Sequence, residues 1–271
     1  MAVPRMSTLQ TAAQACLLAN TIESKVSLTF DAVEAFSRGR LAIDRGERLN
    51  DPIGMPGRPA TPRLVAPRDL HKRGLGSAEG LAAFVHAIAH IEFNAVDLAW
   101  DAVYRFEGMP DAYYADWVGI AGDEARHFTL LRARLQELGF DYGSFDAHHG
   151  LWEMAEKTAD DALARMALVP RVLEARGLDV TPGMIERLRA LGDHRTADIL
   201  VVILREEIAH VAAGSKWFRW CCVQRGVEPA PTFRRLLAEY ARAVLRGPFN
   251  VDARSAAGFD EDELRALGAY G

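Results

Sequence analysis

The sequence has few cysteines and no long uncharged apolar run. Its three cysteines, Cys16, Cys221 and Cys222, form neither a Cys-x-x-Cys pair nor an even set. This argues against a disulfide scaffold, and we expect the three thiols to be reduced core residues. Because no stretch of about 18 uncharged apolar residues is present, no transmembrane helix is expected.

A strong charge of one sign is also missing. Lysine and arginine number 32 against 37 aspartates and glutamates, a formal net charge of −5. This balance disfavours a general nucleic-acid coat and an anionic membrane surface as partners. The first 20 residues lack the compact apolar block and small-residue cleavage site of a signal peptide. The sequence therefore predicts a soluble, cytoplasmic protein.

Strand signals are nearly absent, and no phosphate-binding glycine loop or Ser-His-Asp arrangement is recognisable. Hydrophobic residues make up 49% of the 271 residues, and after residue 77 they recur with the i, i+3, i+4 spacing of helices. The predicted class is all-α. Helices are expected over residues 77–107, 111–138, 151–176 with a kink at Pro170, 181–191, 193–224 and 229–245. The break from Glu107 to Pro110 permits only a tight reversal, so the first two should pack antiparallel.

The region before residue 77 has a different texture. Residues 8–37 have helix-like spacing, whereas residues 39–76 contain five prolines interleaved with glycines. Such proline density forbids a regular helix, so we predict an extended arm over the body, with a mobile linker as the alternative. The chain is accordingly divided into N-terminal helices and arm (1–76), a four-helix bundle with a fifth helix (77–246) and a C-terminal tail (247–271).

Two predicted helices each contain the motif Glu-x-x-His. The copies are Glu124 to His127 and Glu207 to His210. Residues three apart share one helix face, so the carboxylate and the imidazole can reach the same ion. One copy alone is common by chance and would mean little.

The motif is repeated with a partner glutamate. Glu92 precedes Glu124 by 32 residues (124 − 92), and Glu174 precedes Glu207 by 33 (207 − 174). Dimetal bundles use one glutamate from each of two helices and Glu-x-x-His from the other two. Four carboxylates and two imidazoles suit two Fe ions, with Mn or a mixed Fe/Mn pair as alternatives. Other carboxylates that could replace Glu174 as a ligand are Glu153, Glu156, Asp160 and Asp161.

Other polar residues allow smaller hypotheses. Asp123 and Glu206 each precede a motif glutamate, and each is either a solvent-facing charge or a hydrogen-bond partner of a ligand histidine. His86 and His90 lie four apart on one helix, but His90 sits about 200° around it from Glu92, so we interpret both as packing residues rather than ligands.

Several segments resemble a known family. They are VPRVLEARGLD at residues 169–179, HIE at 90–92, DEARH at 123–127 and GPFN at 247–250. Together they resemble an uncharacterised bacterial ferritin-like family, a domain of unknown function numbered 455, over nearly the whole chain. The chain is more distantly similar to tRNA-hydroxylating diiron enzymes. The resemblance implies a ferritin-like fold and the same six ligands, but no settled reaction.

The leading functional hypothesis is a non-haem diiron oxidoreductase of the hydroxylase type. It would use O2, an unidentified substrate and an electron-donor protein, as a monomer or dimer. One alternative is a ferroxidase or other metal-handling protein without an organic substrate. Another is a non-catalytic, partner-binding helical bundle whose carboxylates and histidines form buried salt links.

The arm region also contains many basic residues. They are Arg38, Arg40, Arg45, Arg48, Arg58, Arg63, Arg68, Lys72 and Arg73. Phosphate contacts from such an arm are physically reasonable, so a tRNA partner is a further hypothesis. Basic arms more often serve solubility or structure, and tRNA is the less favoured interpretation.

Overall fold

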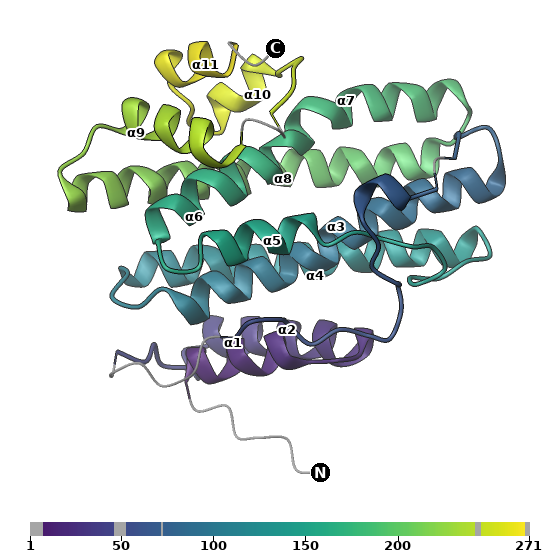
Figure 1. Ribbon diagram of the computed structural model, residues 1–271. Coiled ribbons are helices and arrows are strands. Elements are labelled where there is room, and N and C mark those ends of the chain that lie inside the picture. The colour runs from purple at the N-terminus through teal and green to yellow at the C-terminus, as the bar shows by residue number, and fades with distance from the viewer. Residues whose placement is uncertain (1–7, 46–52, 72, 242–244, 269–271) are drawn as a thin grey trace. The chain divides into compact units, whose positions relative to one another are not determined.

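The computed structural model describes residues 8–45, 53–71, 73–241 and 245–268. Within these ranges every regular element is helical, apart from isolated bridges between Thr8 and Ala42 and between Leu64 and Ala147. This confirms the all-α prediction. The chain divides into two compact units, Met1–Trp152 and Glu153–Gly271 (Figure 1). The three-part division based on the sequence stays a prediction.

The first unit is built on a long helical hairpin of α3 (Ala78–Arg105) and α4 (Asp111–Glu137). The Ser77 side chain accepts a hydrogen bond from the backbone of Gly80 and so begins α3, as the sequence predicted. Gly108, with φ of 70°, makes the reversal between the helices. The hydroxyl of Tyr113 then donates to the carbonyl of Ala102 across the hairpin. The two helices therefore run antiparallel side by side.

Two shorter helices pack on this hairpin. Residues 8–37 form α1 (Leu9–Leu18) and α2 (Ile22–Ser37), each begun by a threonine, Thr8 or Thr21, in a capping box. Helix α1 contacts α3, and α2 contacts α4 (Figure 1).

A buried ion pair lies between α2 and α3. Lys25 is fully buried and donates to Asp97 and, at 3.1 and 3.2 Å, to the carbonyls of Cys16 and Leu17. These carbonyls lie at the end of α1, where they also accept from the backbone amides of Ala19 and Gly57. Lys25 therefore adds a donor at the end of one helix and pairs with the carboxylate of another. Burial raises the pKa of Asp97, and Lys25 opposes that effect. All three cysteines are buried and free, as predicted.

The described part of the proline-rich region is an extended arm fixed to the first unit. Gly57 donates to the carbonyl of Leu17 at 2.7 Å, close enough that a Cβ at residue 57 would clash. The other anchors are Arg105 to the Ile53 carbonyl, Trp152 to the Gly54 carbonyl, Arg58 to Asn94, and Val65 to the Ala147 carbonyl. This arrangement favours the arm over the mobile linker. Arg48, Pro52 and Lys72 lie outside the described residues.

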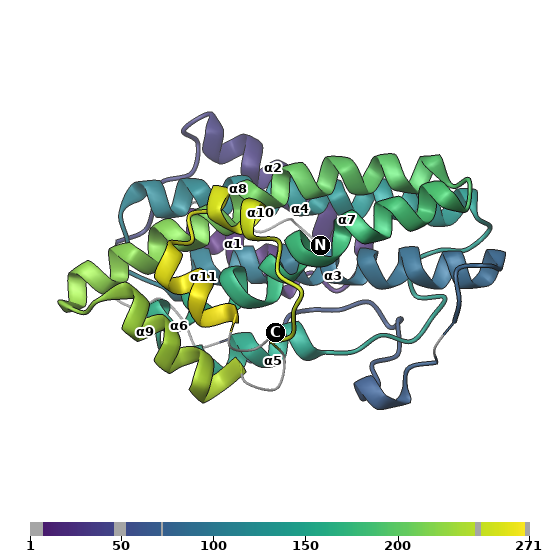
Figure 2. The same cartoon turned by 90° about the horizontal axis from the view of Figure 1, so that it is seen from above.

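The second unit contains a helical hairpin whose first half is interrupted. The short helix α5 (Gly150–Lys157) spans the boundary between the units. After it come α6 (Ala162–Leu168), the π-helical segment η2 (Val169–Glu174), α7 (Ala175–Ala190) and α8 (His194–Arg225), shown from above in Figure 2. The predicted helix 193–224 matches α8, and Asp193 caps it.

The predicted helices 151–176 and 181–191 are wrong. The first helix ends at Lys157, and Asp161 caps the next one. The Asp161 carboxylate accepts hydrogen bonds from the backbone amides of Leu163 and Ala164 in the first turn of α6. Helix α7 then runs past Gly177 and through Pro182. Pro182 cannot donate to the carbonyl of Leu178, but the Asn250 side chain does so at 3.1 Å. A distant residue therefore supplies the donor that the proline lacks.

The C-terminal region is more helical than predicted. The expected helix 229–245 is α9 (Pro229–Leu236) followed by a π-helical segment (Leu237–Ala241), and residues 242–244 lie outside the described ranges. The tail contains α10 (Val251–Ala256) and α11 (Glu261–Gly268), which contact α7, α8 and α9 of the same unit.

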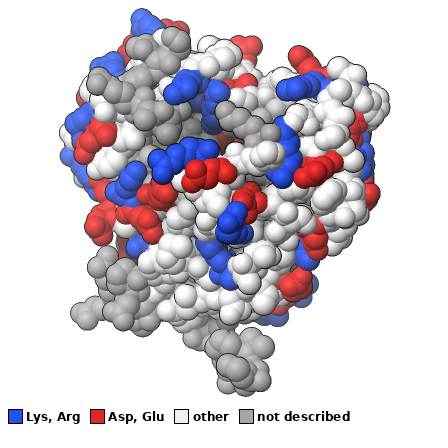
Figure 3. Space-filling view, turned by 45° about the vertical axis from the view of Figure 1, so that its right-hand side comes forward, with Lys and Arg blue, Asp and Glu red and all other residues white. Residues whose placement is uncertain are grey.

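Among the described residues, α3 is the one helix long and apolar enough to cross a membrane. Of its most apolar window, 67% is buried inside the protein, which is typical of a core helix in a soluble protein. On the face shown in Figure 3, basic and acidic side chains are interspersed, as the balanced composition predicts.

A pair of glycine substitutions tests the close packing of α8 on η2. A Cβ on Gly214 would lie 2.4 Å from Pro170, whereas a Cβ on Gly183, inside α7, would meet nothing within 4 Å. We expect Gly214→Ala to destabilise the fold by about 1–3 kcal/mol and Gly183→Ala to stabilise it by about 0.5–1 kcal/mol. Thermal or urea unfolding measures both, and equal effects would contradict the packing described.

The start of α6 gives a pH-dependent prediction. Asp161 caps α6 and forms two hydrogen bonds to Arg225 at 2.7 and 3.0 Å. Burial alone would raise the pKa of Asp161, but the bonds from Arg225 and the α6 amides lower it. Asp161→Ala should cost about 1–2 kcal/mol at pH 7.

Because the folded pKa of Asp161 is lowered, its contribution is present above the unfolded pKa and is lost as pH falls through the folded value. Urea unfolding at several pH values should show the deficit of Asp161→Ala shrinking in acid. The neighbouring exposed residue provides the control: Asp160→Ala should have little effect at any pH.

Candidate metal centre

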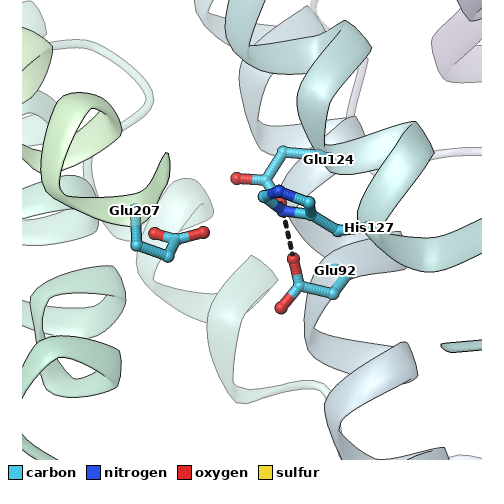
Figure 4. A group of neighbouring side chains, drawn as sticks. All are labelled: Glu92, Glu124, His127 and Glu207. Carbon is cyan, nitrogen blue, oxygen red and sulfur yellow. Dashed lines mark hydrogen bonds and ion pairs between the residues drawn. The ribbon is translucent and has the colours of Figure 1, made fainter. Parts of the chain in front are cut away.

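Three of the predicted ligands meet inside the first unit. Glu92 comes from α3, and Glu124 and His127 come from one face of α4 (Figure 4). Each offers one ligand atom, and these atoms lie within 4.8 Å of one another. Exposure is 5% for Glu92, 1% for Glu124 and 0% for His127. The three form a buried cluster that could hold a metal ion.

The geometry of the cluster follows from the two helices. Nδ1 of His127 lies 3.1 Å from a carboxylate oxygen of Glu92 and 3.5 Å from one of Glu124. Glu124 and His127 are one turn apart on α4, so their side chains leave the helix on the same face. The antiparallel hairpin places Glu92 opposite them.

The electrostatics of the cluster favour a cation. Burial alone would lower the pKa of His127, but hydrogen bonds to Glu124 and Glu92 raise it to about 11. In the absence of a metal ion, His127 is therefore the cation that offsets two buried carboxylates. A divalent ion would take over this role, and the imidazole would bind it in its neutral form. Two carboxylate oxygens and one imidazole nitrogen are a donor set that suits Fe and Mn.

The second unit contains the other copy of the motif. Glu207 and His210 lie one turn apart on α8, with Nδ1 of His210 3.4 Å from a carboxylate oxygen of Glu207. Both are buried, with 9% and 2% exposure. Figure 4 also labels Glu207. Glu174 is the last residue of η2, and its Oε2 atom is buried.

The structure thus brings together Glu92, Glu124 and His127 in one unit, and Glu207 with His210 in the other. The full six-ligand set stays a prediction. Of the alternatives to Glu174, Glu153, Glu156 and Asp160 are exposed, and Asp161 is engaged by α6 and Arg225.

The two carboxylates beside the motif glutamates contact arginines. A carboxylate oxygen of Asp123 lies 3.0 Å from a guanidinium nitrogen of Arg126, and one of Glu206 lies 3.3 Å from a guanidinium nitrogen of Arg205. A hydrogen bond donated by a ligand histidine to either carboxylate stays a prediction.

Sequence reasoning missed Tyr142, which lies between the expected helices 111–138 and 151–176. Its ring contacts Phe93 and Phe128, the sequence neighbours of Glu92 and His127, at centroid distances of 5.1 Å. The rings of Phe93 and Phe128 also contact each other, so the three buried rings form one aromatic group that joins α3 and α4 to the segment after α4.

Tyr142 also explains the two other histidines of α3. His86 stacks on the Tyr142 ring, and Nδ1 of His90 is 2.8 Å from the Tyr142 hydroxyl. Burial lowers the pKa of His86 to about 4 and that of His90 to about 3, so both are neutral. They are packing histidines, as the sequence indicated.

Comparison with known proteins agrees with this description without adding a reaction. Residues 18–265 match a family described as "Protein of unknown function (DUF455)". An "Uncharacterized protein" of Haemophilus influenzae is 47% identical over 215 residues, which cover 76% of this chain and 74% of the relative. No solved structure matches the chain. The extent of the family match and the identity to this relative show that the chain belongs to the DUF455 family.

Proposed function

We propose that this protein is a dimetal carboxylate oxidoreductase that uses O2, with iron as the metal. In this proposal Glu92, Glu124 and His127 bind together with the second set, which is Glu174, Glu207 and His210. The helices that carry them would form a ferritin-like four-helix bundle. The substrate is an organic molecule, and the reaction type we favour is hydroxylation.

The buried cluster of Glu92, Glu124 and His127 is the observation that carries the proposal. Burying two carboxylates is expensive unless cations and hydrogen bonds compensate for it. A chain that needed only a stable core could place leucines at these positions. The same Glu-x-x-His geometry is repeated on α8, with nearly the same nitrogen-to-oxygen distance, 3.4 Å against 3.5 Å. A duplicated, buried donor set is expected of a pair of ions.

The residues of this chain would have separate tasks in the reaction. Two ferrous ions, when bound, would supply two of the four electrons that reduce O2, and the hydroxylated substrate would supply the other two. An electron-donor protein would then return the ions to the ferrous state. Glu92 and Glu124 balance positive charge, while His127 contributes a neutral nitrogen donor once its proton leaves. All three of these side chains are buried, which keeps bulk water from the cluster and would protect a reactive oxidant from solvent.

A tRNA substrate is not part of this proposal. Arm arginines that would meet phosphates are already paired: Arg63 with Asp146 at 2.6 Å and Arg73 with Glu79 at 3.1 Å. Paired arginines contribute little to the long-range attraction of a polyanion.

Metal analysis followed by oxygen consumption tests the proposal. Protein purified without chelator should contain iron, and metal-free protein should take up about two Fe(II) per chain under anaerobic conditions. Mixing with O2 should then consume O2 in a rapid phase. A protein that holds two irons but consumes no O2 would rule out the oxidoreductase.

Two other outcomes replace the proposal with a different function. Iron accumulation far beyond two per chain, in a large assembly on size exclusion, would indicate storage or ferroxidase activity. A protein that is isolated without metal and also rejects added iron would indicate a partner-binding bundle whose glutamates and histidines form buried salt links.

A further inference from the structure

We propose that the C-terminal tail positions Glu174 by fixing the π-helical segment η2 through two buried side chains, Arg254 of α10 and Glu263 of α11. The role of Glu174 as a ligand rests on the function proposed above. The new element is a positioning role for a tail more than 70 residues away in sequence.

Segment η2 is a wide turn whose backbone needs donors from outside the helix. A π-helical turn departs from the regular i to i−4 ladder, and Pro170 has no N–H to contribute. Arg254 supplies two donors: one nitrogen lies 3.5 Å from the carbonyl of Arg171, and another lies 3.3 Å from the carbonyl of Ala175. One guanidinium therefore spans the two carbonyls on either side of Glu174.

The guanidinium of Arg254 is itself held in place. It forms two hydrogen bonds with the carboxylate of Asp179 in α7, at 2.9 and 2.7 Å, and both side chains are buried. Asp179 also accepts from the backbone amide of Asn250, at the start of α10. The two hydrogen bonds to Asp179 fix the orientation of the planar guanidinium of Arg254, so its remaining N–H groups point towards η2.

A second anchor holds the same segment. Arg171 lies within η2, is fully buried, and forms an ion pair with Glu263 at 2.7 Å. Its Nε atom donates to Ser215 at 3.1 Å. The rings that stack around its guanidinium at 4.3–4.6 Å are Phe218, Phe233 and Phe259.

The chemistry of the two anchors indicates positioning rather than bulk stability. Apolar packing alone would hold a tail against the helices, but it would tolerate small shifts along them. A buried ion pair is more sensitive to such shifts, because the attraction between its charges offsets the cost of desolvation only when the geometry is close to ideal. Two such pairs converge on six residues, Val169–Glu174, which places the Glu174 carboxylate at a defined height and rotation.

The double variant Asp179→Asn with Arg254→Met tests the inference. Asparagine keeps an acceptor for the Asn250 amide, and methionine keeps much of the buried volume, so no buried charge is left alone. The matched control is Arg265→Met, because Arg265 is an exposed arginine of α11 paired only with nearby Asp262 in the described structure. Amide hydrogen exchange of residues 169–176 in metal-free protein is one readout, and Co(II) stoichiometry with its visible absorption spectrum is the other.

In the double variant, the amides of residues 171–176 should exchange about tenfold faster or more, while those of α3 and α4 stay unchanged. Bound Co(II) should fall from about two per chain towards one, with a changed spectrum for the weakened site. Arg265→Met should match the wild type in both readouts. Faster exchange with wild-type Co(II) binding and spectrum would overturn the positioning role, and unchanged exchange would overturn the anchor itself.

The two proposals fail in different ways. If the wild-type protein binds no Co(II) or Fe(II), the proposed function fails, and exchange in the metal-free protein still decides whether Arg254 fixes η2. If the double variant does not fold, Arg254→Lys replaces it. Lysine retains the charge opposite Asp179 but cannot span two carbonyls, and the same readouts apply with the same contradicting results.

Discussion

Replacing Glu124 by glutamine should weaken metal binding by about 100-fold or more, which corresponds to roughly 2.7 kcal/mol. Glutamine keeps the size of the buried side chain but removes the charge that offsets a divalent ion. The remaining pair, Glu92 and His127, is 3.1 Å apart and can close as a hydrogen-bonded ion pair. The hairpin of α3 and α4 should therefore stay folded while its affinity for metal falls.

Competition of Co(II) or Fe(II) against a coloured chelator measures this effect. Glu137→Gln is the matched control, because Glu137 ends the same helix and pairs at the surface with Arg134. Its affinity should equal that of the wild type. If Glu124→Gln bound metal within about threefold of the wild type, which is under 1 kcal/mol, the cluster on α3 and α4 would not be a metal centre.

Removing the buried ammonium group of the first unit should produce the largest loss of stability. Lys25→Met leaves the Asp97 carboxylate buried without the Lys25 ammonium and removes one of the donors to each of the Cys16 and Leu17 carbonyls. Breaking a buried pair from one side costs about 3–5 kcal/mol. We expect the midpoint of urea unfolding to fall accordingly, and Lys157→Met, an exposed change in α5, to leave it in place.

The same variant has a defined dependence on pH. Without Lys25, which lowers the pKa of Asp97, burial raises that pKa further. A carboxyl whose folded pKa is raised destabilises the fold above its unfolded pKa, and this penalty disappears as pH falls. The deficit of Lys25→Met should therefore shrink in mild acid, and Lys25→Met with Asp97→Leu should recover part of it at pH 7. A deficit that stays constant with pH would show that lost packing, not the unpaired charge, is responsible.

The first unit was the more predictable half of the protein. The apolar spacing of α3, the cap at Ser77 and the reversal through Gly108 are local signals, and the structure confirms them. The same spacing places Glu92 on the inner face of α3, opposite Glu124 and His127. Local periodicity was therefore sufficient to identify the cluster.

The second unit was less predictable because its backbone depends on distant side chains. Pro182 should have ended a helix, but Asn250 satisfies the carbonyl that the proline leaves open. The widened turn at η2 likewise relies on Arg254. Contacts across some 70 residues leave no periodic signal in a single sequence, and this is why Glu174 could be proposed as a ligand while its surroundings could not.

The attachment of the arm has a consequence for proteolysis. Trypsin must draw an extended stretch of backbone into its active site, so a bond inside a fixed segment is cut only after local opening. Arg58 and Arg63 lie between the anchors of the arm, whereas Arg68 is 88% exposed in the short turn Pro67–Asp69. Brief digestion should therefore cut after Arg68 before it cuts after Arg58 or Arg63.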